Sequence, residues 1–285
     1  PAGGGVDTAG RLLGTKLAEA IGRPVVIDNR AGANGMIGSE MVAKAPKDGY
    51  TLMVNGANFV TSPTLYAKAL YDPIRDFEAI SLLAHAPNVL VVHPSLPVKS
   101  VRELIAFAKA RPGDILFAGS GSGSTPHLAG ELFRTLTGTK MAHVPYRGTG
   151  PAIPAILSGE VSTMFMPALT ALPLIQGNRI RALAVTSLER LPALPELPTV
   201  NESGLKGYQS SQWYGLLAPA GTPAEILNLL NGHAAKIMQS ADMKERMKNS
   251  GSVAVGSTRE VFAKFVQSEF TKWAKVIKAS GATVD

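Results

Sequence analysis

The chain contains no cysteine among its 285 residues, and it lacks several other features that mark common classes of protein. Without cysteine there is no thiol nucleophile, no disulfide and no cysteine-ligated zinc. No apolar run approaches the roughly 18 residues that a membrane-spanning helix needs. The five histidines are His85, His93, His127, His143 and His233, and no two have the H-x-x-x-H spacing, so we expect no metal site.

Charge is present but is not concentrated. The formal net charge is +7, with Lys and Arg spread along the chain rather than clustered with aromatic residues. A nucleic-acid interface would need such a cluster, so we expect no nucleic-acid partner. A diffuse basic surface fits an acidic small ligand and ordinary solubility equally well. The 45% hydrophobic content is enough for a normal core, and the length allows two domains.

Strand-like and helix-like segments alternate almost throughout. The expected strands are 24–27, 50–54, 88–92, 114–118, 141–144, 161–165, 180–186 and 213–218. The expected helices are 9–21, 35–44, 100–109, 128–136, 150–158, 169–176 and two more that begin at 222 and 257. Capping boxes at Ser100–Glu103, Thr222–Glu225 and Ser257–Glu260 mark three of these helix starts. The alternation predicts an α/β fold with mainly parallel sheets.

The chain is expected to pass twice between two domains. Two stretches, 86–94 and 212–219, are placed to carry it across. We therefore predict a discontinuous first domain, 1–93 plus 214–285, and an inserted second domain, 94–213. Because a loop that leads into a helix normally follows a strand in an α/β unit, we also expect a strand upstream of Pro1.

Four short loops rich in glycine or small residues each come directly before an expected helix. They occupy 1–7, 30–35, 119–127 and 144–151. Helix starts expose unpaired backbone N–H groups and a partial positive charge, and glycine lets a ligand approach that backbone closely. Around one cleft, such loops would form a receptor for an anion, and a carboxylate is the most plausible.

The same loops lack the signatures of common enzymes. Residues 119–125 lack the GK[ST] of a nucleotide-binding P-loop. The G-x-G-x-x-G spacing of a dinucleotide-binding loop is absent both here and at Gly3–Gly5. No G-x-S-x-G nucleophile elbow surrounds Ser120, Ser122 or Ser124. These loops can still form a nest of backbone N–H groups that binds another kind of anion.

Several polar side chains stand near strand ends, where ligands bind in open α/β sheets. Asp7 either caps the first helix or hydrogen-bonds a ligand, and His127 either packs locally or lines the cleft. The remaining candidates, for which turn or surface chemistry is an equal explanation, are Asn55, Asn58, Thr61, Tyr146 and Arg147.

Taken in order, the loops resemble those of a known family. The matching pieces are 1–8, 26–35, 48–52, 119–127, 144–148, 194–200 and 213–219. In this order they are similar to the extracytoplasmic substrate-binding receptors of tripartite tricarboxylate transporters, the Bug or TctC-like family. Each piece is weak alone, but together they cover essentially the whole chain.

The resemblance implies a two-domain periplasmic binding protein fold of type II, which closes over a ligand in the cleft between the domains. It implies a small carboxylate ligand, either a di- or tricarboxylate or an acidic amino acid, and no cofactor. Family members hold one carboxylate largely through backbone groups and ordered water, and pass the ligand to a membrane permease. We expect a periplasmic monomer that does not itself span the membrane, with a signal peptide upstream of this sequence.

Carried onto this chain, the resemblance implies a set of ligand-binding residues and no catalytic one. The first loop supplies Ala2, Gly3, Gly5 and Asp7, and the Gly/Ser loop supplies Ser122, Gly123, Ser124 and Thr125. We add Tyr146 and Ala168, and from the strand-end position Asn58.

Two other functions remain open on the same scaffold. One is an α/β enzyme that acts on an anionic small molecule, for which Asp7 and His127 are the acid–base candidates. A carboxylate–histidine pair within hydrogen-bond reach in the cleft would support it. The other is a sensor domain that reports ligand occupancy to a membrane partner.

Overall fold

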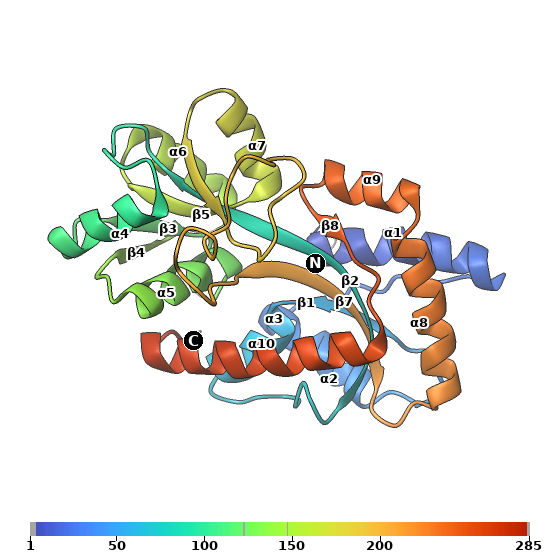
Figure 1. Ribbon diagram of the computed structural model, residues 1–285. Coiled ribbons are helices and arrows are strands. Elements are labelled where there is room, and N and C mark those ends of the chain that lie inside the picture. Colours follow the sequence, from blue (N-terminus) through green and yellow to red (C-terminus); the bar gives the residue numbers. More distant parts are fainter. Residues whose placement is uncertain (1–3, 122, 147, 284–285) are drawn as a thin grey trace.

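The computed structural model describes residues 4–121, 123–146 and 148–283 as two α/β lobes (Figure 1). Its helices are α1 Gly5–Ile21, η1 Ala33–Gly35, α2 Met36–Ala43, α3 Asn58–Leu65, α4 Val101–Ala110, α5 Thr125–Thr137, α6 Thr149–Ser158, α7 Ala168–Gln176, α8 Ala224–Met238, α9 Ala241–Asn249 and α10 Arg259–Ser280. Its strands are β1 Met53–Gly56, β2 Phe77–Val92, β3 Leu116–Gly119, β4 Ala142–Pro145, β5 Thr163–Pro167, β6 Arg181–Val185, β7 Ser211–Pro219 and β8 Val253–Ala254.

One long strand, β2, belongs to both lobes. Its residues 77–87 pair with β7, which together with β1 and β8 forms the sheet of the first lobe. Its residues 88–92 pair with β5 in the second lobe, whose sheet also contains β3, β4 and β6. Figure 1 shows β2 and β7 side by side where the chain crosses between the lobes. Domain boundaries at 93/94 and 213/214 would fall just after β2 and inside β7, and they stay a prediction.

The expectation of mainly parallel sheets is wrong for the described residues. Among the pairs of named strands, the parallel ones are β3 with β4 and β3 with β5, whereas the partners of β2 and the β1–β7 pair are antiparallel. The reason is that β2 and β7 cross between the lobes in opposite directions, so each brings antiparallel pairing into the sheets. Local periodicity does not report the direction of a partner that lies far away in sequence.

The expected strand at 24–27 is also wrong. This segment has no strand hydrogen bonding, and Val26 is 85% exposed. Val25 and Ile27 instead pack against α1, where their side chains lie close to the position that a Cβ on Gly14 would occupy. An apolar run forms a strand only when a neighbouring strand pairs with it, and no described strand does so here.

The three capping boxes differ in outcome. The Ser100 hydroxyl accepts from the Glu103 N–H (3.2 Å), which confirms the predicted start of α4. The Thr222 hydroxyl instead donates to a backbone carbonyl, and α8 begins without a side-chain cap, so that box is wrong. In the third, Thr258 rather than Ser257 caps α10, one residue later than predicted.

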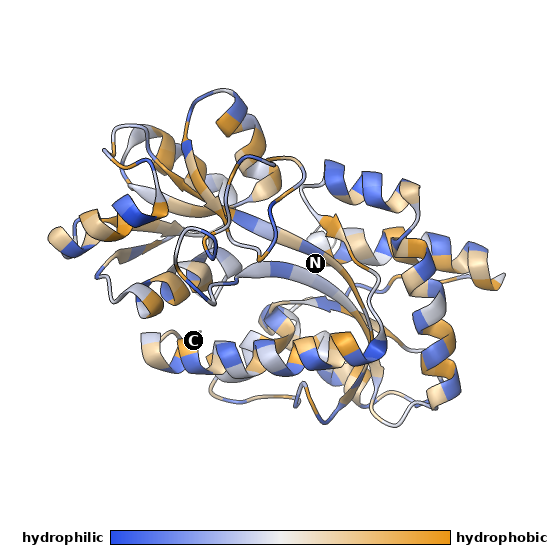
Figure 2. Cartoon of the chain, in the orientation of Figure 1, coloured by the Kyte–Doolittle hydropathy of each residue, from blue (hydrophilic) through white to orange (hydrophobic). Residues whose placement is uncertain are grey.

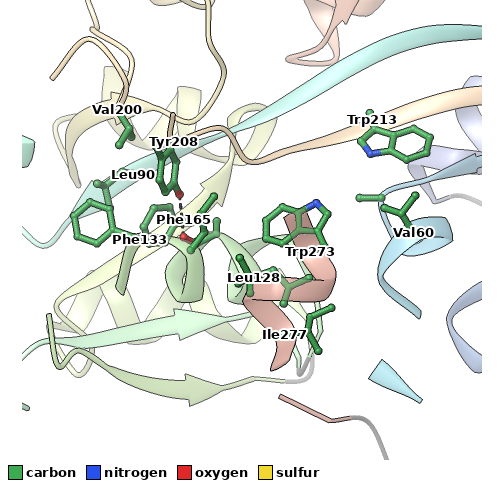
Figure 3. Packing of buried hydrophobic residues seen from close by; sticks show 14 of the residues in the cluster. Val60, Leu90, Leu128, Phe133, Phe165, Val200, Tyr208, Trp213, Trp273 and Ile277 are labelled. Atoms are coloured by element: carbon green, nitrogen blue, oxygen red, sulfur yellow. Dashed lines mark hydrogen bonds between the residues drawn. The ribbon is translucent and has the colours of Figure 1, made fainter. Parts of the chain in front are cut away.

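Helix α10 packs on both lobes. Near its start, Phe262 meets Trp213 of β7 in an edge-to-face contact with ring centres 5.7 Å apart. Near its end, Trp273 and Ile277 lie beside Leu128 of α5 (Figure 3). Polar and apolar residues alternate along α10, as a helix with one buried face requires (Figure 2). The apolar face of this helix is therefore a core element that joins the lobes.

No helix within the described part of the chain is both long and apolar enough to cross a membrane.

Candidate functional site

Two adjoining cavities, of about 500 Å³ and about 260 Å³, lie between the lobes. The larger one is bounded by the first turns of α1, by β2 and β7 at their crossing, and by the starts of α5 and α7. The smaller one is bounded by the start of α3, the Gly/Ser loop after β3 and the side of α10. A volume of several hundred cubic ångströms is typical of a site for a small organic ligand.

Three helices begin at the larger cavity. Helices α1 and α7 start after Gly4 and Pro167 without any side-chain cap. Helix α5 has Ser124 as its N-cap, and the Ser124 hydroxyl accepts from the His127 N–H (3.3 Å). Uncapped helix starts present free backbone donors and the positive end of the helix dipole. Their convergence makes this cavity suited to a negatively charged group.

None of the described side chains that line the larger or the smaller cavity carries a formal charge. Donors are instead hydroxyls and amides, including Thr8, Asn88, Gln212 and Tyr214 around the larger cavity. Burial raises the pKa of the Tyr214 phenol above its ordinary value, so it stays protonated and able to donate. The arrangement can bind an anion through dipoles and hydrogen bonds, without a cationic side chain among the described lining residues.

The structure brings most of the described candidates together at these cavities. Gly5 and Ala168 line the larger cavity, Asn58 and Gly123 line the smaller one, and Ser124 and Thr125 line both. The Asn58 amide also donates to the Asn34 carbonyl. Four residues named from the sequence, Ala2, Gly3, Ser122 and Arg147, lie outside the described residues.

Of the candidates named from the sequence, Asn55 and His127 are not among the described lining residues, and neither are Asp7 and Tyr146. The Asp7 carboxylate, in the first turn of α1, accepts from the Asn29 amide (2.8 Å) and pairs with Arg11 (2.9 Å). It does not cap the helix, because Gly4 holds the cap position without a side-chain bond. The Tyr146 hydroxyl donates to Glu160 (2.8 Å). A role for either residue in ligand binding stays a prediction.

His127 packs behind the Gly/Ser loop rather than lining the cleft. Its Nδ1 accepts from the Gly123 N–H (3.0 Å), and its ring stacks on His143 with ring centres 3.9 Å apart. Burial lowers the pKa of each of these two imidazoles to about 4, and the nearby Arg134 acts in the same direction, so both are neutral at pH 7. A neutral His127 can accept the Gly123 N–H and so holds the loop in place.

The buried histidines predict a loss of stability in mild acid. Burial also lowers the pKa of His85 to about 4, with Lys272 nearby acting in the same direction. Unfolded histidine titrates near 6.5, so between about pH 6.5 and 4 the unfolded chain binds more protons than the folded one. The histidine contribution is full above pH 6.5 and is lost as the pH falls toward 4. We expect the free energy of unfolding to drop by at least about 1 kcal/mol over this window.

Thermal melts from pH 7.5 to 4.5 measure this effect. His143→Phe removes one of the titrating groups, and we expect a shallower decline for that variant than for the wild type. A melting temperature that is flat or rises toward acid would contradict the assignment.

Some lining residues were missed by the sequence analysis. Asn88, Gln212 and Tyr214 line the larger cavity from the crossing strands β2 and β7, where the placement of the lobes exposes them to it. Gln212 and Tyr214 flank the apolar Trp213, which is fully buried, so strand alternation places them together on the opposite face of β7. This alternation is the signal in the sequence that could have identified them.

Comparison with known proteins identifies the family of this chain. Residues 10–282 match the family described as tripartite tricarboxylate transporter family receptor. The solved structure of Rpa4515 from R. palustris with adipate is 37% identical, covering 99% of this chain and 95% of that one, with a TM-score of 0.80.

Two further solved structures extend the comparison. The periplasmic binding protein BugD is 33% identical over 99% of this chain and 95% of its own, with a TM-score of 0.76. MatC from Rhodopseudomonas palustris with bound malate is 31% identical over 97% and 96%, with a TM-score of 0.76. These similarities confirm the expected two-domain periplasmic binding protein fold of type II.

Proposed function

Because the chain belongs to the tripartite tricarboxylate transporter receptor family, we propose that it is an extracytoplasmic receptor for a small carboxylate. The ligand class is a di- or tricarboxylate or an acidic amino acid, which the receptor delivers to a membrane permease. The observation that carries the proposal is the convergence of three helix starts on a cavity whose described lining is uncharged.

The physics of that cavity favours a carboxylate. A carboxylate accepts several hydrogen bonds at once, and bonds to a charged group are each worth about 1.5–3 kcal/mol. Gly5 and Ala168 bring backbone to the cavity from one lobe each, so a ligand between them would favour closure. The adipate of Rpa4515 and the malate of MatC are both dicarboxylates and support the same class here.

We propose that the protein works in the periplasm as a monomer and hands its ligand to permease subunits. BugD is named a periplasmic binding protein, which supports this location. A sensor domain that reports ligand occupancy to a membrane partner would bind the carboxylate in the same way.

An enzymatic role is the less favoured alternative. It needs an acid–base pair in the cleft, and neither Asp7 nor His127 is among the described lining residues. The nearest carboxylate to the His127 ring, Glu131, lies 3.7 Å from Nε2 and pairs with Arg134 at 2.7 Å. A distance of 3.7 Å is beyond hydrogen-bond reach.

Thermal shift with a panel of carboxylates tests the proposal. A ligand that is present at 100 times its dissociation constant stabilises the folded state by about 2.7 kcal/mol, which corresponds to about 5 °C or more in a chain of this size. We expect at least one di- or tricarboxylate to give such a shift at millimolar concentration. Neutral diamides of the same acids are the matched controls. A panel without any shift would refute the proposal.

A further inference from the structure

The two cavities of the cleft meet along a boundary to which one side chain of a crossing strand contributes. They share four lining residues, Ser120, Ser124, Thr125 and Gln212. The first three belong to the Gly/Ser loop and the start of α5 in the second lobe. Gln212 alone comes from β7, the strand that crosses between the lobes. The boundary between the cavities is therefore a contact between the second lobe and a crossing strand.

That contact is a hydrogen bond. The Thr125 hydroxyl donates to Gln212 Oε1 over 2.9 Å. Both residues are partly buried, so water competes weakly for the bond. With the bond made, the amide of Gln212 stands between the larger cavity and the smaller one.

The end of β1 makes room for this amide. A Cβ at Gly56 would lie 2.4 Å from Gln212 Nε2, closer than real Cβ contacts. Only glycine at this position lets the Gln212 side chain lie against β1 while its Oε1 reaches Thr125. The amide is therefore held between an element of the first lobe and the first residue of α5.

Both cavities offer groups that can bind an oxygen-rich end of a ligand. The larger has the starts of α1 and α7, and the smaller has the amides of Asn34 and Asn58 and the hydroxyl of Thr61 among its lining residues. A short dicarboxylate would fit with both ends in the larger cavity. The far end of a longer one would have to pass Gln212 to reach the smaller cavity.

We infer that Gln212 limits the length of the ligand by closing the passage between the two cavities. This inference rests on the proposed carboxylate-binding function and adds to it a preference for short dicarboxylates. The preference is a property of the glutamine side chain, which acts by its bulk across the passage and is held there by Thr125.

Calorimetric titration with succinate, adipate, suberate and sebacate tests the inference. Gln212→Ala removes the bulk of the side chain, and Gln212→Met keeps most of the bulk but removes the amide. In Gln212→Ala we expect the affinity ratio of sebacate to succinate to rise by about 10-fold, equivalent to one decade in dissociation constant. In Gln212→Met we expect a smaller rise, of about 3-fold, because the bulk stays while the bond to Thr125 that holds it is lost. Gln212→Ser provides a second truncation, and thermal melts verify that each variant is folded.

The outcomes separate the inference from the proposed function. A ratio that is unchanged in both truncations would overturn the role of Gln212. A rise in Gln212→Met as large as that in Gln212→Ala would overturn the claim that the bulk of the side chain closes the passage. If the wild-type protein binds none of the four acids while it is folded, the proposed function fails for dicarboxylates and the inference fails with it.

Discussion

Ser120→Asp is expected to weaken dicarboxylate binding by about 100-fold. Ser120 follows β3 and lines both cavities, so a charge at this position faces a bound carboxylate in either of them. Two like charges about 5 Å apart at an effective dielectric constant of about 20 repel by about 3 kcal/mol, which is roughly a 100-fold change in affinity. The described lining offers no cation to offset the added charge.

Ser120→Asn is the matched control, because asparagine has nearly the same size and shape as aspartate and no charge. We expect this variant to lose less than about 10-fold in affinity. Titration of both variants with the same dicarboxylate measures the difference. Equal losses in the two variants would mean that both substitutions weaken binding by their size alone. The cleft would then not bind an anion near this position.

Gly119→Ala is expected to destabilise the second lobe by about 3 kcal/mol, at the upper end of overpacking effects. A Cβ at Gly119 would lie 2.2 Å from Nε2 of His143 and 3.2 Å from Cβ of His127. The His143 ring has little freedom to move, because it stacks on His127 and lies with its centre 5.1 Å from that of Phe117. The Gly119 carbonyl also accepts from the Tyr146 N–H (2.9 Å), which limits a shift of the strand.

Denaturant unfolding of single and double variants measures this effect. His143→Ala removes the ring that clashes, so the double variant should be no less stable than His143→Ala alone. Gly232→Ala is a control within α8, where a Cβ meets nothing within 4 Å, and it should leave stability unchanged or slightly raised. Additive losses in the double variant would contradict the proposed clash.

Much of the fold follows from local sequence signals. The order of helices and strands from α4 to β6 agrees with the hydrophobic periodicity, and Ser100 begins its helix by the predicted cap. The glycine loops also predicted where helices would open on a cleft, as the starts of α1 and α5 do. These features depend on residues close together in sequence.

What the sequence did not predict depends on distant contacts. Only 88–92 was expected as a strand, whereas β2 runs from Phe77 to Val92. Its first part is held by β7, more than a hundred residues away, and the antiparallel direction of that pairing has no local signal. The Thr125–Gln212 bond is likewise invisible until the two lobes are placed.

The central claim is that the cleft selects the negative charge of a carboxylate through helix starts and neutral donors. Calorimetric titration of the wild-type protein with the best dicarboxylate of the thermal-shift panel, and with its diamide, tests this claim directly. The diamide has nearly the same shape and carries no charge. We predict binding of the dicarboxylate and at least about 100-fold weaker binding of the diamide. Equal affinity for the two compounds would contradict the claim.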